Sequence, residues 1–406
     1  MTGIAEASQR YRILIVDDSM VARSAMRQVM ERAGLASTLD IAVDGQHALR
    51  TVARMAMKGT PVEIVLLDIE MPVMDGLAAL PRILEVAPAP RVIMSSVLTR
   101  RGAAVSMQAI TLGASDYLCK PTSQEGLYGE QFQSELIEKV HCWGRLARRA
   151  ASEVLNPKTA ASTVRPVASG SAPSSGAAGS AQGARASLAR MPDKQPVDTP
   201  GLRARPDIQA LAIGCSTGGP QALMSIFRGE TLSLRLPIFL TQHMPPTFTT
   251  ILSEQLSRVA ARDCHEGIDG ELVKPDTIYV APGDRHMLIE RKSPDEVRIR
   301  LDDGPPRNFC RPAVDPMLES LVVAYGARLC AVILTGMGHD GLDGCRSVHG
   351  AGGVVVAQDA ETSVVWGMPG AVARQGLADA VLPLDTIPGQ LIQLLGPKSK
   401  ERRRAS

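Results

Sequence analysis

A segment without aromatic residues divides this sequence of 406 residues into two parts. Residues 151–206 are dominated by Ala, Ser, Gly and Pro, as in RPVASGSAPSSGAAGSAQGARAS. A chain of this composition buries too little apolar surface to offset the entropy that is lost when it becomes ordered. We therefore predict a flexible linker at 151–206, which joins an N-terminal domain to a larger C-terminal domain.

Both flanking parts alternate short β-branched runs with helical patterns, which is typical of parallel α/β sheets. In the first part, strands are predicted at 12–16, 38–43, 62–67, 91–95 and 116–119, with a last helix near 130–149. In the second part, strands are predicted in IQALAIG, LPIFLTQ, ARLCAVILTG and GGVVVAQ. The predicted fold class is α/β, with a doubly wound, flavodoxin-like five-stranded domain followed by a larger, doubly wound and mainly parallel α/β domain.

The charge of the C-terminal part argues against a nucleic-acid partner, and the cysteine pattern indicates the compartment. Residues 207–396 contain 15 basic and 22 acidic side chains, which opposes binding to a nucleic-acid backbone. The segment 397–406 is basic, and we interpret it as a solvated tail. The seven cysteines form no CxxC pair, and the sequence shows no signal peptide and no long apolar run. We expect a cytoplasmic protein with reduced thiols and no segment inserted into a membrane.

Acidic residues lie at the ends of two predicted strands in the first domain. Asp17 and Asp18 directly follow the first strand, and Asp68 directly follows the third. Ligands of open parallel sheets bind beyond the carboxyl ends of the strands, so these carboxylates should meet. Crowded carboxylates repel one another unless a cation lies among them, and Mg²⁺ prefers such oxygen ligands. One such acid alone would more often be a helix cap, but the set predicts a Mg²⁺ site.

A hydroxyl and a lysine are predicted at the same edge of this sheet. Ser95 ends the fourth predicted strand, and Lys120 ends the fifth, directly before a proline. With a cation among the carboxylates, Asp68 can attack a phosphoryl group while Lys120 and Ser95 bind its oxygens. The pattern therefore predicts phosphoryl transfer to Asp68.

A serine between glycines begins the second domain. In IGCSTGGPQAL, Ser216 occupies the G-x-S-x-G pattern that presents the nucleophile in many hydrolases. His243 ends the apolar run LPIFLTQ, and Asp340 lies in the glycine-rich loop of AVILTGMGHDG. At one edge of the sheet, Ser216 would attack an acyl carbon, His243 would move the proton, and Asp340 would fix the imidazole tautomer.

Backbone amides near Ser216 are expected to stabilise the oxyanion. Candidates are the amides of Thr217 and Gly218, at the start of the next helix, and that of Met337. The other histidines that could serve as base are His265, His286, His339 and His349. Spacing alone does not rank all of them. The alternative to catalysis is a phosphate-binding turn, although the sequence lacks the GK[ST] ending of a P-loop, and the order Ser, His, Asp differs from that of α/β-hydrolases.

Four segments of the first domain resemble the receiver domain of bacterial response regulators over residues 11–128. They are ILIVDDS, VLLDIEMPVMDG, VIMSS and DYLCKP. The resemblance implies that Asp68 accepts a phosphoryl group from a partner histidine kinase and that Ser95 is the switch hydroxyl. The Mg²⁺ ligands that it implies are Asp17, Asp18, Asp68 and the backbone carbonyl of Glu70.

Five segments of the second domain resemble the catalytic domain of CheB, the chemotaxis protein-glutamate methylesterase, over about residues 207–396. They are IGCSTGGPQAL, TQHMPPTFT, APGDRHM, RPAVDPML and ILTGMGHDG. This family carries a receiver ahead of the catalytic domain, in the order found here. The resemblance implies the same triad and oxyanion contact, with His286 and Arg311 shaping the crevice. It does not cover the linker.

The two resemblances together imply a phosphorylation-regulated enzyme of chemotaxis. Its substrates would be methyl-accepting chemoreceptors, from whose glutamate γ-methyl esters it would release methanol, and it would deamidate specific receptor glutamines. The esterase site would need no cofactor, and the unphosphorylated receiver would obstruct the crevice. Two alternatives remain, a response regulator whose output domain only binds DNA or protein, and an amidase of a small metabolite.

Overall fold

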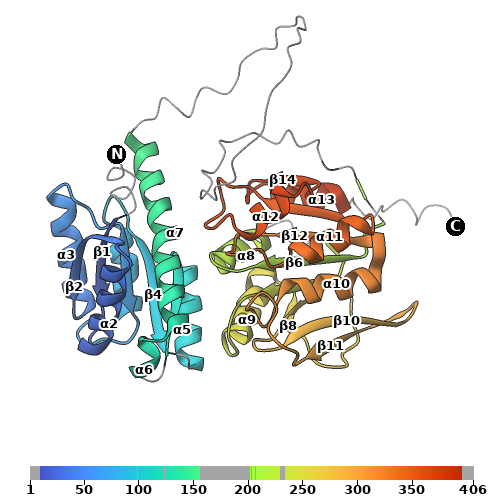
Figure 1. Cartoon of the computed structure of the whole chain (residues 1–406), viewed down its shortest axis with the longest axis horizontal. Coiled ribbons are helices and arrows are strands. Elements are labelled where there is room, and N and C mark those ends of the chain that lie inside the picture. Colours follow the sequence, from blue (N-terminus) through green and yellow to red (C-terminus); the bar gives the residue numbers. More distant parts are fainter. Residues whose placement is uncertain are drawn as a thin grey trace, which may run out of the picture.

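The structure, a computed structural model, contains two α/β domains that lie next to each other (Figure 1). The described residues are 10–97, 99–121, 124–155, 202, 204–205, 207–228 and 234–395. Most of the predicted linker and the whole of the predicted tail 397–406 lie outside these residues. No helix among the described residues is both long enough and apolar enough to cross a bilayer.

The N-terminal domain is built on a parallel sheet of five strands in the order β2-β1-β3-β4-β5. Its strands are β1 (Tyr11–Val16), β2 (Ala36–Ala42), β3 (Ile64–Asp68), β4 (Arg91–Val97) and β5 (Asp116–Lys120). Its helices are α2 (Met20–Arg32), α3 (Gly45–Met57), α4 (Gly76–Leu84), α5 (Arg100–Thr111), α6 (Gln124–Leu127) and α7 (Glu130–Leu155). Side chains of α2 and α7 pack on one face of the sheet, and those of α3, α4 and α5 pack on the other. The predicted doubly wound domain is thus confirmed.

Side-chain caps start four helices of this domain directly after the loops at the carboxyl edge of the sheet. Ser19, Asp44, Asp75 and Thr99 each accept a hydrogen bond from a backbone amide in the first turn of α2, α3, α4 and α5, respectively. Such caps satisfy amides that have no partner within the helix. They fix where each helix begins, and with it the short loops that carry the acidic residues.

Helix α7 is longer than predicted and extends into the first residues of the predicted linker, 151–155. The sequence ASEVL consists mainly of residues that tolerate or favour helix, so the helical pattern continues. The helix is attached to the start of β5, because Lys139 Nζ lies 3.0 Å from Asp116 Oδ1 and Trp143 Nε1 donates to Asp116 Oδ2 at 3.1 Å. At the other end of the predicted linker, the amide of Arg205 donates to the carbonyl of Leu394 at 2.6 Å.

The C-terminal domain contains a parallel sheet of seven strands in the order β14-β13-β12-β6-β7-β9-β8. Its strands are β6 (Ala210–Cys215), β7 (Ile238–Gln242), β8 (Asp263–Glu266), β9 (Thr277–Val280), β12 (Leu329–Ile333), β13 (Val354–Gln358) and β14 (Ala380–Leu382). The helices are α8 (Gly219–Phe227), α9 (Phe248–Ala260), α10 (Val314–Tyr325), α11 (Leu342–Gly350), α12 (Met368–Arg374) and α13 (Ile387–Leu395). Helices α8, α9 and α13 cover one face of the sheet, and α10, α11 and α12 cover the other.

An antiparallel hairpin of β10 (His286–Ser293) and β11 (Glu296–Asp302) packs beside α10. The four strands predicted in this domain are all present, and the larger, mainly parallel α/β fold is confirmed. The prediction missed β8, β9, β14 and the hairpin. Strands β8, β9 and β14 have only three or four residues, and the hairpin strands contain many charged side chains and few fully buried ones.

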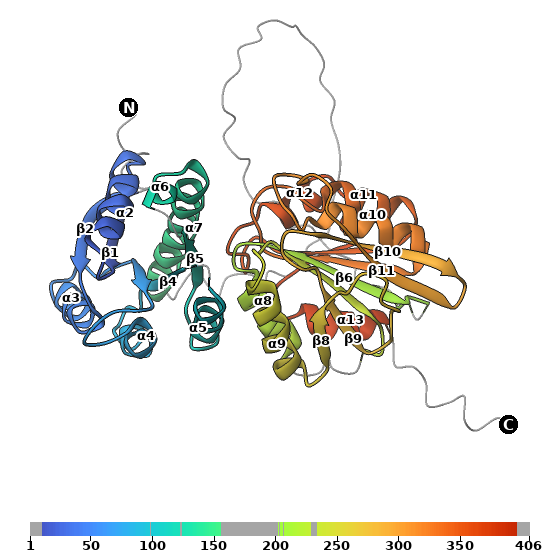
Figure 2. The ribbon, with the colours of Figure 1, turned by 90° about the horizontal axis from the view of Figure 1, so that it is seen from below.

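The two domains meet where α5 packs against α8 and α9 (Figures 1 and 2). Tyr117 of β5 stacks on Phe248 of α9, with ring centroids 4.8 Å apart. Arg100 of α5 forms an exposed ion pair of 3.5 Å with Glu254 of α9. The side chain of Gln221 in α8 donates a hydrogen bond to the backbone carbonyl of Ala114 in the N-terminal domain. The contact therefore combines an apolar stack with polar links around it.

Candidate functional site

The three acidic residues predicted in the N-terminal domain lie together. Asp17, Asp18 and Asp68 each offer a carboxylate oxygen, and these oxygens lie within 4.8 Å of one another. They meet because β1 and β3 are adjacent parallel strands whose carboxyl ends are in register. Lys120 Nζ, at the end of β5, lies 3.0 Å from Asp17 Oδ2 and 2.6 Å from Asp68 Oδ1.

The electrostatics of Asp68 suit a site that binds a cation. Burial is the largest cause that raises the pKa of Asp68 to about 6, with a further contribution from Asp17, while Lys120 acts in the opposite direction. The single positive charge of Lys120 therefore does not balance the negative charge of the acidic cluster. A set of hard oxygen ligands with one exposed member, Asp18, fits a divalent ion such as Mg²⁺ that keeps part of its water shell.

Ser95 and Glu70 flank this acidic cluster. Ser95 of β4 is the register partner of Asp68, and its Oγ is buried without a hydrogen-bond partner among the described residues. A buried hydroxyl without a partner is costly, so this atom is available to a ligand oxygen. Glu70 lies in the loop directly after β3, with its side chain exposed and 3.5 Å from Arg101. The role of its backbone carbonyl stays a prediction.

Ser216 and His243 lie at the carboxyl ends of two adjacent strands in the C-terminal domain. Ser216 directly follows β6, His243 directly follows β7, and the last residues of these strands, Cys215 and Gln242, are in register. The side chain of Gln242 donates from Nε2 to the carbonyls of Ser216 (3.0 Å) and His243 (3.2 Å). Gln242 therefore fixes the backbone of both residues, a role that the sequence analysis missed although the glutamine is adjacent to His243.

Asp340 is buried and lies 2.8 Å, Oδ2 to Nε2, from His243. It also accepts hydrogen bonds from the backbone amides of Val314 (2.6 Å) and Asp315 (3.2 Å), at the start of α10. Burial alone would raise the pKa of Asp340, but the contact with His243 and these hydrogen bonds hold it below its ordinary value. The carboxylate is therefore ionised, and it orients the imidazole.

The second nitrogen of His243 faces Cys310, whose Sγ lies 3.5 Å from Nδ1. Burial lowers the pKa of His243, but its hydrogen bonds with Asp340 and Cys310 outweigh burial and raise it to about 9. The hydrogen bonds among the described residues include none between Ser216 Oγ and His243. In this conformation Nδ1 of the imidazole is turned to the thiol.

Asn308 joins Asp340 to a second buried carboxylate. Its Nδ2 donates to Asp340 Oδ1 at 3.0 Å and to Asp315 Oδ2 at 2.8 Å. Asp315 Oδ1 accepts the amide of Gly344 at 2.7 Å, and burial raises the pKa of this carboxyl. No role was predicted for Asp315, the aspartate of RPAVDPML, or for Asn308 and Cys310. The sequence offers one signal for Asn308 and Cys310, because both lie just before RPAVDPML, a segment that carries the resemblance.

The residues expected to bind the oxyanion lie on the loops around Ser216. Thr217 and Met337 line the same cavity as Ser216. Gly218 has φ +77 and begins α8 without a side-chain cap, and the carbonyl of Thr217 accepts a hydrogen bond from Thr335 Oγ1 at 2.9 Å. The loop is thus fixed on both sides of the serine, and the assignment of the amides stays a prediction.

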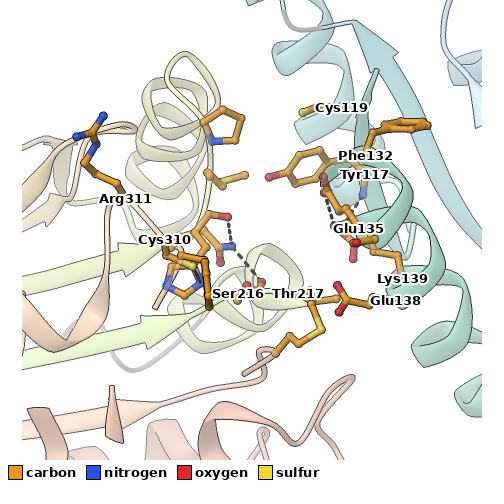
Figure 3. Close-up of a pocket in the computed structure, with 18 of the residues that line it drawn as sticks. Tyr117, Cys119, Phe132, Glu135, Glu138, Lys139, Ser216, Thr217, Cys310 and Arg311 are labelled. Atoms are coloured by element: carbon orange, nitrogen blue, oxygen red, sulfur yellow. Dashed lines mark hydrogen bonds and ion pairs between the residues drawn. The ribbon is translucent and has the colours of Figure 1, made fainter. Parts of the chain in front are cut away.

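The alternative histidines form no hydrogen bond with Asp340 among the described residues. His286 is buried, donates from Nε2 to the carbonyl of Pro305 (3.1 Å) and accepts at Nδ1 the amide of Ala313 (3.2 Å), so both of its nitrogens bind the backbone. His265 pairs with Glu271, and His339 and His349 are exposed. Arg311 pairs with Asp284 at 2.6 Å at the rim of the cavity (Figure 3). His243 is the histidine that contacts Asp340.

A cavity of about 870 Å³, here called the interdomain cavity, is lined by both domains. The C-terminal domain contributes Ser216, His243 and Met337 to its wall. The N-terminal domain contributes residues of β5 and α7, among them Tyr117 and Lys139, which lie opposite Ser216 (Figure 3). Access to Ser216 is thus limited by the neighbouring domain.

Comparisons with known proteins identify the family of each domain. Residues 211–391 match the family model described as CheB methylesterase, and residues 13–130 match that of the response regulator receiver domain. A relative from Paramagnetospirillum magneticum, named protein-glutamate methylesterase/protein-glutamine glutaminase 1, is 45% identical and the match covers 96% of this chain and 97% of the relative. A protein of Azospirillum brasilense with the same name, without the numeral, is 44% identical, with 93% and 90% covered. The crystal structure of the Thermotoga maritima CheB methylesterase catalytic domain is 43% identical, covers 46% of this chain and 98% of that chain, and has a TM-score of 0.45.

Proposed function

The chain belongs to the family of CheB methylesterases that carry a receiver domain, and we propose that it is a phosphorylation-regulated hydrolase of chemoreceptor glutamate γ-methyl esters. It would also deamidate specific receptor glutamines, because an amide and an ester pass through a similar tetrahedral oxyanion. Removing a methyl group restores a negative charge on the receptor, and this would serve adaptation in chemotaxis. The observation that supports the proposal most directly is the contact of 2.8 Å between His243 Nε2 and Asp340 Oδ2 beside Ser216.

In the proposed mechanism, the hydrogen of the neutral imidazole lies on Nε2. Because Asp340 occupies Nε2, the neutral His243 carries its hydrogen there, and Nδ1 must accept the proton of Ser216. Ser216 Oγ then bonds to the γ-carbonyl carbon, and His243 returns the proton to the methoxy oxygen, which leaves as methanol. Water, deprotonated by the same nitrogen, hydrolyses the acyl-enzyme to a glutamate carboxylate. The oxyanion would be stabilised by the backbone amides of Thr217, Gly218 and Met337. Each amide would lower the activation free energy by about 3 kcal/mol.

The receiver domain would control this reaction through Asp68, which accepts a phosphoryl group from a histidine kinase. The ion held by Asp17, Asp18, Asp68 and the carbonyl of Glu70 would be Mg²⁺. When bound, it supplies the positive charge that phosphoryl transfer needs. Lys120 and the unpartnered hydroxyl of Ser95 are suited to bind phosphoryl oxygens.

Regulation would follow from the wall that the receiver contributes to the interdomain cavity. The unphosphorylated receiver obstructs Ser216, and phosphorylation shifts the population toward an open arrangement. We propose that the receiver spans 11–128, that the linker begins after the end of α7 and runs to 206, and that the catalytic domain spans 207–396. The protein would act in the cytoplasm and would contact receptors and a kinase but no nucleic acid.

The test of this proposal is methanol release from methylated receptor by the full chain, with and without a phosphodonor. Ser216→Ala should reduce the rate by roughly 10³-fold or more, whereas His349→Gln, at an exposed histidine, should not. Asp68→Asn should keep the basal rate and lose the stimulation. If the output domain only binds a partner, the wild type should release no methanol. If the protein is an amidase of a small metabolite, it should hydrolyse free glutamine instead.

A further inference from the structure

Phe309 is an aromatic side chain with no burial, located beside the proposed triad. Its exposed fraction is 103%, the largest among the exposed large hydrophobic residues described. The chain contains only five phenylalanines, and Phe309 lines the interdomain cavity. Single exposed apolar residues are common on protein surfaces, but this ring also lines the cavity that contains Ser216, so it lies where a bound substrate would pass.

The backbone holds this ring in a turn that does not suit it. Arg307 and Cys310 exchange both backbone hydrogen bonds, at 3.0 and 2.9 Å, so Asn308 and Phe309 are the two central residues of a tight hairpin turn. Both central residues have positive φ, +52 for Asn308 and +64 for Phe309. Such turns favour Asn followed by Gly, because a bulky residue is strained in the left-handed region. Strained residues of this kind gather at functional sites.

The turn is attached to the proposed catalytic residues on both sides of the ring. Asn308 donates to Asp340 at 3.0 Å, and Cys310 Sγ lies 3.5 Å from His243 Nδ1. Arg307, at the base of the turn, forms two hydrogen bonds with Glu319, at 2.9 and 2.7 Å. The backbone position of Phe309 is therefore fixed relative to the imidazole and the carboxylate.

The receiver does not account for the ring. In this structure the receiver is docked on the catalytic domain, yet Phe309 remains fully exposed. No described residue covers the ring, so it stays available to a partner from outside the described residues. A glutamyl ester that reaches Ser216 would occupy the cavity with its side chain, and the neighbouring residues of the same segment would then lie at the rim.

We propose that Phe309 is a specificity residue that binds an apolar side chain of the receptor segment carrying the glutamyl ester. This inference rests on the proposed function. Aromatic residues make effective anchors because they bury a large area and lose little conformational freedom. Phe309 would thus select apolar side chains near the esterified glutamate and would contribute to receptor binding but not to the chemistry.

The experiment compares a protein substrate with a small ester, using the full chain and acetyl phosphate as phosphodonor. Phe309→Asn removes the ring and suits the left-handed turn, and Phe309→Leu keeps an apolar side chain. The control is Val323→Asn, at an exposed apolar residue of α10. For Phe309→Asn, kcat/KM for methylated receptor should fall roughly 10- to 30-fold, mainly through KM, because loss of an anchor residue has effects of this size. Hydrolysis of p-nitrophenyl acetate should stay within twofold, Phe309→Leu should lose less, and Val323→Asn should match the wild type.

The outcomes separate this inference from the proposed function. If the wild type releases no methanol from the receptor, both the proposed function and this inference are wrong. If the wild type is active and Phe309→Asn releases methanol at the wild-type kcat/KM, only the inference is overturned. Equal losses on the receptor and on the small ester would mean that the ring only supports the turn and would also overturn it. A change of sedimentation from dimer to monomer in Phe309→Asn would assign the ring to a second copy of the chain and would contradict the inference as well.

Discussion

The thiol of Cys310 and the carboxylate of Asp340 contact opposite nitrogens of one imidazole, and both affect its charge. With a pKa of about 9, His243 in this conformation is protonated at neutral pH and cannot accept the proton of Ser216. A general base is most effective when its pKa lies near the working pH. The active conformation must therefore weaken at least one of these two contacts.

The first prediction concerns the pH dependence of this residue. Because the pKa of His243 is raised, the basal esterase rate of the unphosphorylated chain should rise with pH as the imidazole loses its proton on the approach to pH 9. Cys310→Ala removes one of the contacts that raise this pKa, so its profile should move to lower pH and its rate at pH 7 should increase. The measurement is kcat/KM for a small ester from pH 6 to 10. A profile that Cys310→Ala leaves in place would contradict the role given to the thiol.

Asn308 gives the second prediction at this scale. Asn308→Ala removes the donor shared by two buried carboxylates, Asp340 and Asp315, and each loses a hydrogen bond. The expected cost is about 1–3 kcal/mol in the free energy of unfolding, with a reduced kcat, because unsatisfied buried groups are expensive. Urea unfolding and ester hydrolysis measure the two effects. Asn308→Gly keeps the positive φ and is the control for the backbone, so recovery of stability in Asn308→Gly would show that the turn, and not the amide, is responsible.

At the scale of elements, the strand-end residues and one loop residue, Asp340, could be predicted from the sequence, but the other loop contacts of the site could not. Ser216 and His243 follow buried apolar runs, and adjacent parallel strands bring such ends together. Asp340 could be assigned to a loop after β12, but its contact with the imidazole depends on the start of α10, which no local pattern encodes. Asn308 and Cys310 reach the site through a turn far from both strands in sequence. Their contacts follow from tertiary packing and not from periodicity.

The turn between β6 and α8 gives the third prediction. A β-carbon at Gly218 would lie 2.5 Å from the side chain of Val364, and the residue has φ +77. Gly218→Ala should therefore displace the start of α8, cost more than about 2 kcal/mol and abolish ester hydrolysis, while the receiver still accepts phosphate. Gly270 is a matched control, since its φ is +78 but nothing lies within 4 Å. Gly270→Ala should cost only the backbone strain, about 1 kcal/mol, and thermal unfolding of both variants tests the difference. Equal losses in the two variants would contradict the clash.

For the whole molecule, the contact between the domains gives the fourth prediction. The exposed pair of Arg100 and Glu254 contributes little by itself, about 0–1 kcal/mol, but reversing one charge turns attraction into repulsion. Arg100→Glu should raise the basal release of methanol a few-fold without a phosphodonor. The double variant Arg100→Glu/Glu254→Arg restores opposite charges and should return the rate toward that of the wild type. Equal rates in the single and double variants would exclude a role of this pair in holding the domains together.

The wall shared by both domains has a consequence for the covalent connection between them. In the proposed regulation the receiver would inhibit as a tethered ligand, whose local concentration depends on the length of the connection. A protease that cleaved the connecting peptide once would leave every atom of both domains in place, yet it would make inhibition dependent on dilution. At cellular dilution the two fragments would drift apart, and the esterase would become permanently active without any phosphate signal.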